Sequence, residues 1–421
     1  MPKREEPLGR REMLRRGVAV SVGAVASRFI GAAPTTARAS TADSAKPTAG
    51  VEKYPVLGRT GIKISDISLG SGGTADPALF RYAFSRGITY FDTADGYPLG
   101  APGQAEKAIG KALKGKRNQI TLATKTITTP RDRRKKLMRK LEASLRRLQT
   151  DHVDVYFNHA VNEVARVTNP EWLEFTARAK QQGKIRFSGM SGHGGNLAEC
   201  LDVGLDQDLF DVILVAYNFG QDPSFYERFT KPLDMIATQP ELPRILEKAK
   251  KKNVGVVVMK TLMGARLNDM RRYERDDGTF AQAAFRWVLS DPNVDGLIVS
   301  MNDRKQVDEY LAASGQGGVR TSDLQLLDRY VLLNGGSYCR FGCSDCESSC
   351  PHDVPISEVL RSRMYAADYG DLRKGKAVYA ELGEGASACL GCATESCRSA
   401  CGYGLPVPSM TRSTVGLLTL V

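Results

Sequence analysis

The stretch that determines the fold is TYFDTADGY at residues 89–97. It opens with a run of β-branched and aromatic side chains that ends at Asp92, and it continues into a polar turn that contains glycine. A short run of this kind, bounded by a turn, predicts a buried strand. Two titratable side chains, Asp92 and Tyr97, stand at and just after the end of this strand, where barrels of parallel strands place their chemistry.

The same alternation of a short apolar strand with a longer amphipathic helix repeats from residue 50 to about residue 311. This pattern predicts an α/β fold, and eight such units in about 250 residues predict a (βα)8 TIM barrel. The expected strands are residues 64–69, 89–92, 120–124, 153–157, 185–190, 212–216, 255–259 and 296–299. Expected helices include residues 78–86, 104–114, 132–148, 242–252, 280–289 and 303–312.

Length and composition fit one large domain and one small one. The chain has 421 residues, of which 42% are hydrophobic and 25% are charged. This balance is that of a globular protein and excludes disordered, collagen-like and multi-span membrane chains. We expect a leader at residues 1–39, a barrel at 40–320 and a C-terminal domain at 321–421.

The N-terminal segment resembles an export signal. Residues 9–15, GRREMLR, are similar to the twin-arginine signature, and a weakly apolar stretch and the small-residue run TARA at 36–39 follow. A basic arm or a membrane anchor is the alternative, but an apolar stretch of about 11 residues is too short to span a bilayer. The resemblance implies the twin-arginine translocase as a partner, a periplasmic or otherwise exported protein without a stable membrane span, and a cofactor inserted before export.

The net charge of +12 does not by itself indicate a nucleic-acid partner. Residues 1–39 hold eight Lys/Arg and three Asp/Glu, so removing the leader lowers the charge to about +7. The other basic cluster lies in residues 132–148, where Leu137, Leu141, Leu145 and Leu148 recur at helical spacing. We therefore interpret the Lys and Arg residues there as the solvated face of a barrel helix and expect no nucleic-acid binding.

Three expected strand ends carry titratable residues, in TYFDTADGY at 89–97, ATK at 123–125 and DVYFNH at 154–159. These stretches, with GRTG at 58–61, KAIGKAL at 107–113 and FRWVL at 285–289, resemble the aldo/keto reductase family over residues 54–312. The resemblance implies an oxidoreductase with the catalytic tetrad Asp92, Tyr97, Lys125 and His159.

These four residue types suit hydride transfer to a carbonyl. Negative charge develops on the carbonyl oxygen, so a proton donor has to stand beside it. Tyr97 is the expected donor, and the ammonium of Lys125, held by Asp92, is expected to lower its pKa. His159 is expected to orient the carbonyl. Taken singly, the Asp–Lys pair is also compatible with a structural ion pair, and a lone histidine after a strand is commonly a structural residue.

The resemblance also implies a nicotinamide cofactor, NADP or NAD. Ser191 stands where the family holds the carboxamide, and Tyr217 or Met259 stands near the place of the aromatic side chain that stacks on the nicotinamide. Arg304 and Lys305 lie near the N-terminus of the expected helix at residues 303–312 and are suited to bind phosphate. Leu214 and Gln306 depart from the family pattern, which leaves the choice between NADP and NAD open.

Eight of the nine cysteines follow residue 338 in two quartets, whose spacings are C-x3-C-x2-C-x3-C-P and C-x2-C-x4-C-x3-C. Both are close to the bacterial ferredoxin run, in which the fourth cysteine of each run serves the other cluster. We therefore expect a small ferredoxin-like iron–sulfur domain with two 4Fe–4S clusters, in which Cys350 joins the second quartet and Cys401 the first. Two structural zinc sites or four disulfides are the alternatives. The eight cysteines are Cys339, Cys343, Cys346, Cys350, Cys389, Cys392, Cys397 and Cys401.

Two further stretches, SGHG at 191–194 and VMKTL at 258–262, resemble an iron–sulfur subgroup of the same family. The prediction is thus an exported oxidoreductase that interconverts a small-molecule carbonyl and alcohol by hydride transfer, coupled to 4Fe–4S clusters and to a redox partner protein. The competing hypothesis is a non-catalytic electron-transfer or scaffold protein on a degenerate barrel.

Overall fold

The computed structural model of the chain describes residues 49–98, 100–194, 196–221, 239, 241–262, 270–334, 339, 343–367, 372–383, 385–402 and 404–419. The chain divides into two units, residues 1–48 and 49–421, and the described residues all belong to the second. The expected leader at residues 1–39 lies outside the described residues.

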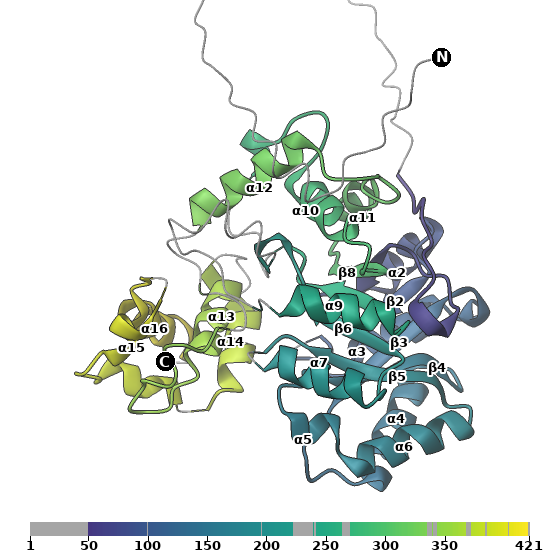
Figure 1. Cartoon of the computed structure of the whole chain (residues 1–421), viewed down its shortest axis with the longest axis horizontal. Coiled ribbons are helices and arrows are strands. Elements are labelled where there is room, and N and C mark those ends of the chain that lie inside the picture. Colours follow the sequence, from purple (N-terminus) through teal and green to yellow (C-terminus); the bar gives the residue numbers. More distant parts are fainter. Residues whose placement is uncertain are drawn as a thin grey trace, which may run out of the picture. The chain divides into compact units, whose positions relative to one another are not determined.

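Eight parallel strands close into a barrel in sequence order, with the first strand paired to the eighth (Figure 1). This confirms the predicted TIM barrel, and every expected strand is present within a few residues of its expected bounds. The runs form strands because their β-branched and apolar side chains are buried on both faces of the sheet. The strands are β1 (Ile67–Gly70), β2 (Tyr90–Asp92), β3 (Thr121–Ile127), β4 (Val153–His159), β5 (Ile185–Gly192), β6 (Val212–Ala216), β7 (Gly255–Met259) and β8 (Gly296–Ser300).

Helices surround the strands (Figure 1), and local sequence explains where several of them begin. Asp76 caps a helix whose first residue is proline, and Thr279 and Gln282 form a capping box. The helices of this part are α2 (Pro77–Ser85), α3 (Gln104–Ala112), α4 (Arg134–Leu148), α5 (Val164–Val167), α6 (Pro170–Gln181), α7 (Leu197–Asp206), α9 (Leu242–Lys251), α10 (Phe280–Leu289) and α11 (Arg304–Leu311).

The basic segment forms α4, and its leucines at positions 137, 141, 145 and 148 are buried while most of its Lys and Arg side chains face solvent. The interpretation as a solvated helix face is therefore confirmed. Arg147 is an exception, because its Nε donates to the buried carboxylate of Glu106 at 2.5 Å.

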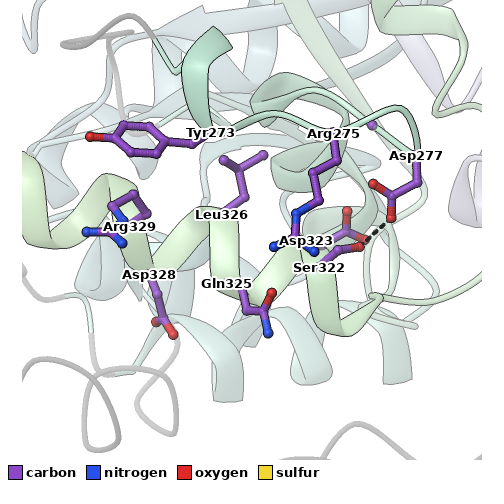
Figure 2. Close-up of a pocket in the computed structure, with 10 residues that line it drawn as sticks. Tyr273, Arg275, Asp277, Ser322, Asp323, Gln325, Leu326, Asp328 and Arg329 are labelled. Carbon is purple, nitrogen blue, oxygen red and sulfur yellow. Dashed lines mark hydrogen bonds between the residues drawn. The ribbon is translucent and has the colours of Figure 1, made fainter. Parts of the chain in front are cut away.

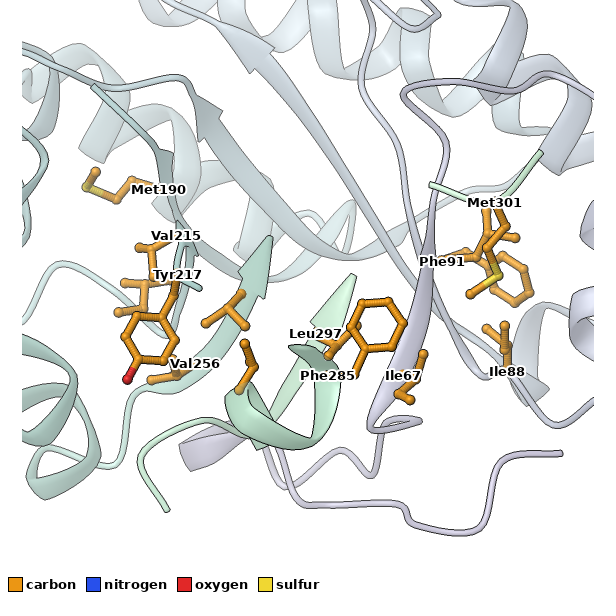
Figure 3. Close-up of a cluster of buried hydrophobic side chains, with 14 of the residues drawn as sticks. Ile67, Ile88, Phe91, Met190, Val215, Tyr217, Val256, Phe285, Leu297 and Met301 are labelled. Carbon is orange, nitrogen blue, oxygen red and sulfur yellow. The ribbon is translucent and has the colours of Figure 1, made fainter. Parts of the chain in front are cut away.

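Two apolar layers hold the barrel. The inner layer fills the barrel interior with side chains such as Phe157, Leu214 and Val257. The outer layer lies between strands and helices, where Figure 3 shows Phe285 of α10 beside Leu297 of β8. Cys200 is fully buried in the outer layer, as expected of a small apolar side chain.

The C-terminal residues are helical in their described part: α12 (Thr321–Asn334), α13 (Ile356–Ala367), α14 (Leu372–Ala380), the 3₁₀ helix η5 (Gly385–Leu390), α15 (Ser396–Ala400) and α16 (Val407–Leu418). From α13 onward they have an apolar cluster of their own, to which Val359, Leu360 and Val415 belong. Helix α12, just beyond the expected boundary at residue 320, packs on the barrel through Leu327 and Tyr330. The buried ion pair of Arg286 on α10 with Asp323 on α12 joins the two helices.

Among the described residues, no helix is both long enough and apolar enough to cross a bilayer.

Candidate active site

Three neighbouring strands carry three of the four expected catalytic residues at one end of the barrel. Asp92 ends β2, Lys125 lies in β3 and His159 ends β4. The register places Asp92 beside Ala123 and Ile127 beside His159. Because all strands are parallel, their carboxyl ends meet at the same rim, which is where barrel enzymes hold their active sites.

Lys125 and Asp92 form a buried ion pair, and each residue is 1% exposed. The ammonium of Lys125 also donates to the carbonyl oxygen of Thr93 at 2.9 Å. Burial lowers the pKa of Lys125 and raises that of Asp92, while the contact between the two opposes both shifts. The pair is thus a fixed dipole in a dry site, a form of electrostatic pre-organisation.

Tyr97 comes from the turn after β2, which two backbone hydrogen bonds fix, from Asp95 N to Lys125 O and from Tyr97 N to Ala94 O. The Nζ atom of Lys125 lies 5.3 Å from the centroid of the Tyr97 ring. The Tyr97 hydroxyl lies 3.4 Å from Nε2 of His159, and the two rings are nearly perpendicular at 88°. The structure therefore brings all four expected residues together.

The expected effect of Lys125 on Tyr97 is not observed. Burial, the carboxylate of Asp92 and the neighbouring Tyr365 raise the pKa of Tyr97 above its ordinary value near 10. The physical reason is that Asp92 offsets the charge of Lys125, so that desolvation dominates. The phenol therefore stays protonated at neutral pH, as a proton donor requires.

His159 is neutral in the same environment. Its pKa lies well below 6.5 because burial disfavours the imidazolium and because Lys125, Arg166 and Lys260 lie nearby. Arg166 holds the backbone of His159 by donating to its carbonyl oxygen at 2.6 Å. A neutral imidazole next to Tyr97 can accept or donate a hydrogen bond, and it can orient a carbonyl without adding charge.

The comparisons with known proteins fit this geometry. The family model "Aldo/keto reductase family" matches residues 75–280. The chain belongs to the aldo/keto reductase family. It is 35% identical over 159 residues to Aldo-keto reductase YhdN of Bacillus subtilis, a match that covers 33% of this chain and 46% of YhdN. It is also 23% identical over 325 residues to L-glyceraldehyde 3-phosphate reductase of Escherichia coli O157:H7, which covers 67% of this chain and 93% of that protein.

The fold is similar to that of an aldo/keto reductase from Klebsiella pneumoniae solved with NADP and acetate. The TM-score is 0.51 at 24% identity, and the match covers 66% of this chain and 95% of that one. The family model matches within the barrel, and it confirms with the relatives the predicted enzyme class, an aldo/keto reductase-like oxidoreductase.

The residues expected to hold a cofactor are distributed unevenly around this aldo/keto reductase barrel. Ser191 is fully buried in β5, and its hydroxyl accepts from the backbone N–H of Ala160, next to His159. Arg304 and Lys305 open α11 after β8, and both are exposed. The guanidinium of Arg304 lies 5.1 Å from the centroid of the Tyr82 ring.

Tyr217 does not occupy the place expected for an aromatic side chain over the nicotinamide. Its ring packs against Trp287 of α10, and its hydroxyl donates to Asp291 at 2.7 Å. Figure 3 shows it in the outer apolar layer near Val215 and Val256. Tyr217, the residue after β6, thus faces the helices. The alternation of side chains along the strand could not predict this direction, because the alternation ends where the strand ends.

Sequence reasoning missed three buried hydroxyl groups at strand ends. Ser71 follows β1, Thr93 follows β2 and Thr261 comes two residues after β7. Each is at most 1% exposed, and none of the three hydroxyls has a hydrogen-bond partner within the described part of the chain. Buried polar groups are normally satisfied, so a set at the catalytic rim fits a site that binds a polar molecule. Their positions one or two residues after expected strands were the available signal.

A pocket of about 390 Å³ lies elsewhere, between the 3₁₀ helix η4 (Arg271–Tyr273) and α12, and Figure 2 shows its walls. None of the four tetrad residues lines it. Its acidic groups have partners, since Asp323 pairs with Arg286 and Asp277 accepts from Ser322 at 2.6 Å. We therefore assign the chemistry to the strand ends.

The eight C-terminal cysteines are thiols in two groups. Cys346 lies close enough to Cys339, Cys343 and Cys401 for their thiolates to raise its pKa, with burial as the larger cause. Cys397 is affected in the same way by Cys350, Cys389 and Cys392. No three or more His, Cys, Asp or Glu side chains in the described residues converge as ligands of a single ion. None of the nine cysteines forms a disulfide bond in the described part of the chain.

Proposed function

We propose that this chain is an exported, NADP(H)-dependent carbonyl reductase that carries two 4Fe–4S clusters in its C-terminal domain. The observation that carries the catalytic part is the protonated Tyr97, placed between a buried Lys125–Asp92 pair and a neutral His159. A proton donor of this kind is what reduction of a carbonyl requires.

When bound, a dihydronicotinamide supplies the hydride that adds to the carbonyl carbon. The chain's residues then have separate tasks. Tyr97 donates its hydroxyl proton to the carbonyl oxygen as the C–O double bond becomes single, and the Lys125–Asp92 pair stabilises the charge that develops there. His159 holds the carbonyl oxygen within reach of the Tyr97 hydroxyl. Ser191, Ser71 and Thr261 would hold polar groups of the cofactor, and Arg304 and Lys305 its phosphates.

The two cysteine groups support the cluster proposal. Each group takes its fourth member from the other quartet, the exchange that two-cluster ferredoxins use. In a cubane, each thiolate binds a different iron, so the four sulfurs are spaced more widely than the ligands of one tetrahedral zinc, which are about 3.8 Å apart. The finding that no side chains of the described residues converge on a single ion therefore does not bear on a cubane.

The alternative is a non-catalytic iron–sulfur protein built on the barrel. Two observations favour it: Leu214 belongs to the inner apolar layer, and Tyr217 faces away from the rim. In addition, hydride transfer moves two electrons together whereas a cluster carries one, so the clusters and the barrel need not exchange electrons.

A fluorescence titration with NADPH separates the two candidates. The anaerobically reconstituted full chain should bind NADPH saturably and reduce an aldehyde, and Tyr97→Phe should keep the binding while losing turnover. Lack of saturable binding by the unmodified protein would reject the reductase and leave the iron–sulfur scaffold.

Metal and sulfide analysis tests the clusters. We expect about eight irons and eight sulfides per chain for two 4Fe–4S clusters. Cys346→Ser should lower both contents by about half, whereas Cys200→Ser, a change of the buried thiol in α7, should leave both unchanged. Zinc in place of iron, or equal losses in the two variants, would reject the assignment.

The export proposal rests on GRREMLR at residues 9–15. We expect residues 1–39 to carry a folded reporter protein out of the cytoplasm, and we expect replacement of Arg10 and Arg11 by lysine to stop this export. Export that is insensitive to the double replacement would argue against the twin-arginine route.

A further inference from the structure

Arg166, the third residue of the short helix α5, is a buried arginine without an ion pair. The residue is 7% exposed, and in the described part of the chain its guanidinium donates to oxygen atoms of uncharged groups only. Two carboxylates lie in its surroundings, but Asp132 is paired with Lys136 at 2.6 Å and Glu163 is exposed. Buried charges are normally paired, because removing them from water is costly. The chain therefore accepts a cost in stability at this position, which indicates a function.

The guanidinium holds the segment that leaves β4. Its Nη2 atom donates to the carbonyl oxygen of His159 at 2.6 Å, and its Nη1 atom donates to that of Ala160 at 2.8 Å. Nη2 also donates to Oδ1 of Asn158 at 3.2 Å, and the Asn158 amide donates back to the carbonyl oxygen of Arg166 at 3.1 Å. The hydroxyl of Thr128 donates to the same Oδ1 atom at 2.9 Å. Three consecutive residues are thus fixed to α5.

Ala160 has a backbone conformation that needs such support. Its φ is +51°, in the left-handed region that residues other than glycine seldom adopt. A residue keeps this conformation only where its surroundings determine it. On the other side, the N–H of Ala160 donates to Oγ of Ser191 at 3.2 Å, and the N–H of Val161 donates to the carbonyl oxygen of Ser191 at 2.8 Å. The peptide after His159 is therefore held between Arg166 and Ser191.

This peptide joins two parts of the candidate active site. One is the imidazole of His159, whose Nε2 atom lies 3.4 Å from the Tyr97 hydroxyl. The other is the Ser191 hydroxyl, which is fully buried. Its oxygen accepts from Ala160, and its own proton has no acceptor within the described residues, so this proton is left to donate to a bound molecule. A tilt of the peptide would displace both groups together.

We propose that Arg166 is a positioning residue for carbonyl reduction: by fixing the peptide that follows His159, it places both the imidazole that orients the carbonyl and the Ser191 hydroxyl that binds the cofactor. The proposal rests on the proposed function, since it assumes that NADPH and a carbonyl compound bind at this rim. A guanidinium suits the task because its planar fork holds five N–H donors in fixed directions. The ammonium of a lysine is a single point charge and cannot reproduce this fork.

Double-variant cycles on the anaerobically reconstituted full chain test this role. Arg166→Lys should lower kcat for aldehyde reduction about tenfold and weaken NADPH binding about tenfold, because it misplaces one hydrogen-bonded group for each. The loss in kcat should shrink to less than about twofold when His159→Gln is already present. The loss in NADPH affinity should shrink to the same extent when Ser191→Ala is present. Stopped-flow turnover and a fluorescence titration with NADPH measure the two quantities.

Two further variants separate positioning from stability. Arg286→Lys changes another buried arginine, the partner of Asp323 on α12. It should lower the free energy of unfolding while leaving kcat and NADPH affinity within about twofold of their values in the unmodified protein. Thr128→Val removes only the hydroxyl that supports Asn158. If Arg166→Lys fails to fold, Thr128→Val should show the same two cycles with smaller losses of about threefold.

Losses of equal size with and without His159→Gln and Ser191→Ala would overturn the proposal and leave Arg166 with a structural role only. An equal loss of kcat in Arg286→Lys would overturn it too, because lowered stability would then be sufficient to explain the effect. A lack of turnover and of NADPH binding by the unmodified protein would reject the reductase itself, and this proposal with it.

Discussion

Replacing Lys125 by methionine separates the catalytic role of the ion pair from its structural role. Methionine keeps the length of the side chain but leaves the carboxylate of Asp92, which is 1% exposed, without its partner. Breaking a buried pair on one side costs about 3–5 kcal/mol in the free energy of unfolding. The double variant Asp92→Asn/Lys125→Met removes both charges, so we expect it to recover all but about 1–2 kcal/mol of that loss.

The double variant should recover stability without recovering activity. Neither variant keeps a cation beneath the carbonyl oxygen, so kcat/KM for aldehyde reduction should fall by about 10²–10⁴ in both. Urea unfolding followed by tryptophan fluorescence measures the barrel selectively, because the two tryptophans, Trp172 and Trp287, lie in α6 and α10. If the double variant regained activity together with stability, the pair would be structural only. If Lys125→Met had the same free energy of unfolding as the unmodified protein, the carboxylate of Asp92 would not be left buried without a partner, as the structure implies.

Three further predictions follow from burial and contacts. The raised pKa of Tyr97 keeps the phenol protonated, so kcat for reduction should stay level from pH 7 to about 10 and fall only above that, as a stopped-flow pH profile would record. Asp323→Ala should lower the free energy of unfolding by about 3–5 kcal/mol, because it leaves Arg286 buried and uncompensated; urea titration measures this. Gly189→Ala should destabilise the barrel by about 3 kcal/mol or more, since the new Cβ would lie 1.7 Å from the carbonyl oxygen of Val212; thermal unfolding measures this.

Each of these predictions has a control or a contradicting result. A fall in reduction rate with an apparent pKa below about 9 would mean that Lys125 lowers the pKa of Tyr97 after all. Ser322→Ala, next to Asp323 on α12, should change the free energy of unfolding by less than about 1 kcal/mol, because the hydrogen bond from the Ser322 hydroxyl to Asp277 is exposed. Gly416→Ala, where no heavy atom lies within 4 Å of the new Cβ, should not destabilise the protein.

The barrel could be predicted because each strand has a recognisable local sequence pattern. Runs such as VILVA at residues 212–216 are apolar and bounded by polar turns, and the strands they form have almost the expected bounds. The basic helix α4 was predictable for the same reason, since its leucines repeat at helical spacing. The tetrad followed from titratable residues at strand ends, because parallel strands bring those ends together.

Other features depend on tertiary contacts that no local pattern encodes. The orientation of Tyr217 is decided by Asp291 and Trp287, which are about seventy residues further along the chain. The pKa of Tyr97 depends on burial and on how completely the charge of Asp92 offsets that of Lys125. The spacing of the motif predicts neither. The contact of α13 with the apolar cluster of the barrel through Met364 likewise required coordinates, because Val359 and Leu360 of the same helix belong to the cluster of the C-terminal domain.

Deuterium transfer tests the central claim, that Tyr97 completes a hydride transfer at this barrel rim. The anaerobic full chain is mixed with NADPH carrying deuterium on C4 and an aldehyde, and the alcohol is analysed by mass spectrometry. The account predicts one deuterium on the carbinol carbon with the unmodified protein and no labelled alcohol with Tyr97→Phe, although that variant still binds NADPH. Labelled alcohol formed at an unchanged rate by Tyr97→Phe, or no labelled alcohol from the unmodified protein, would contradict it.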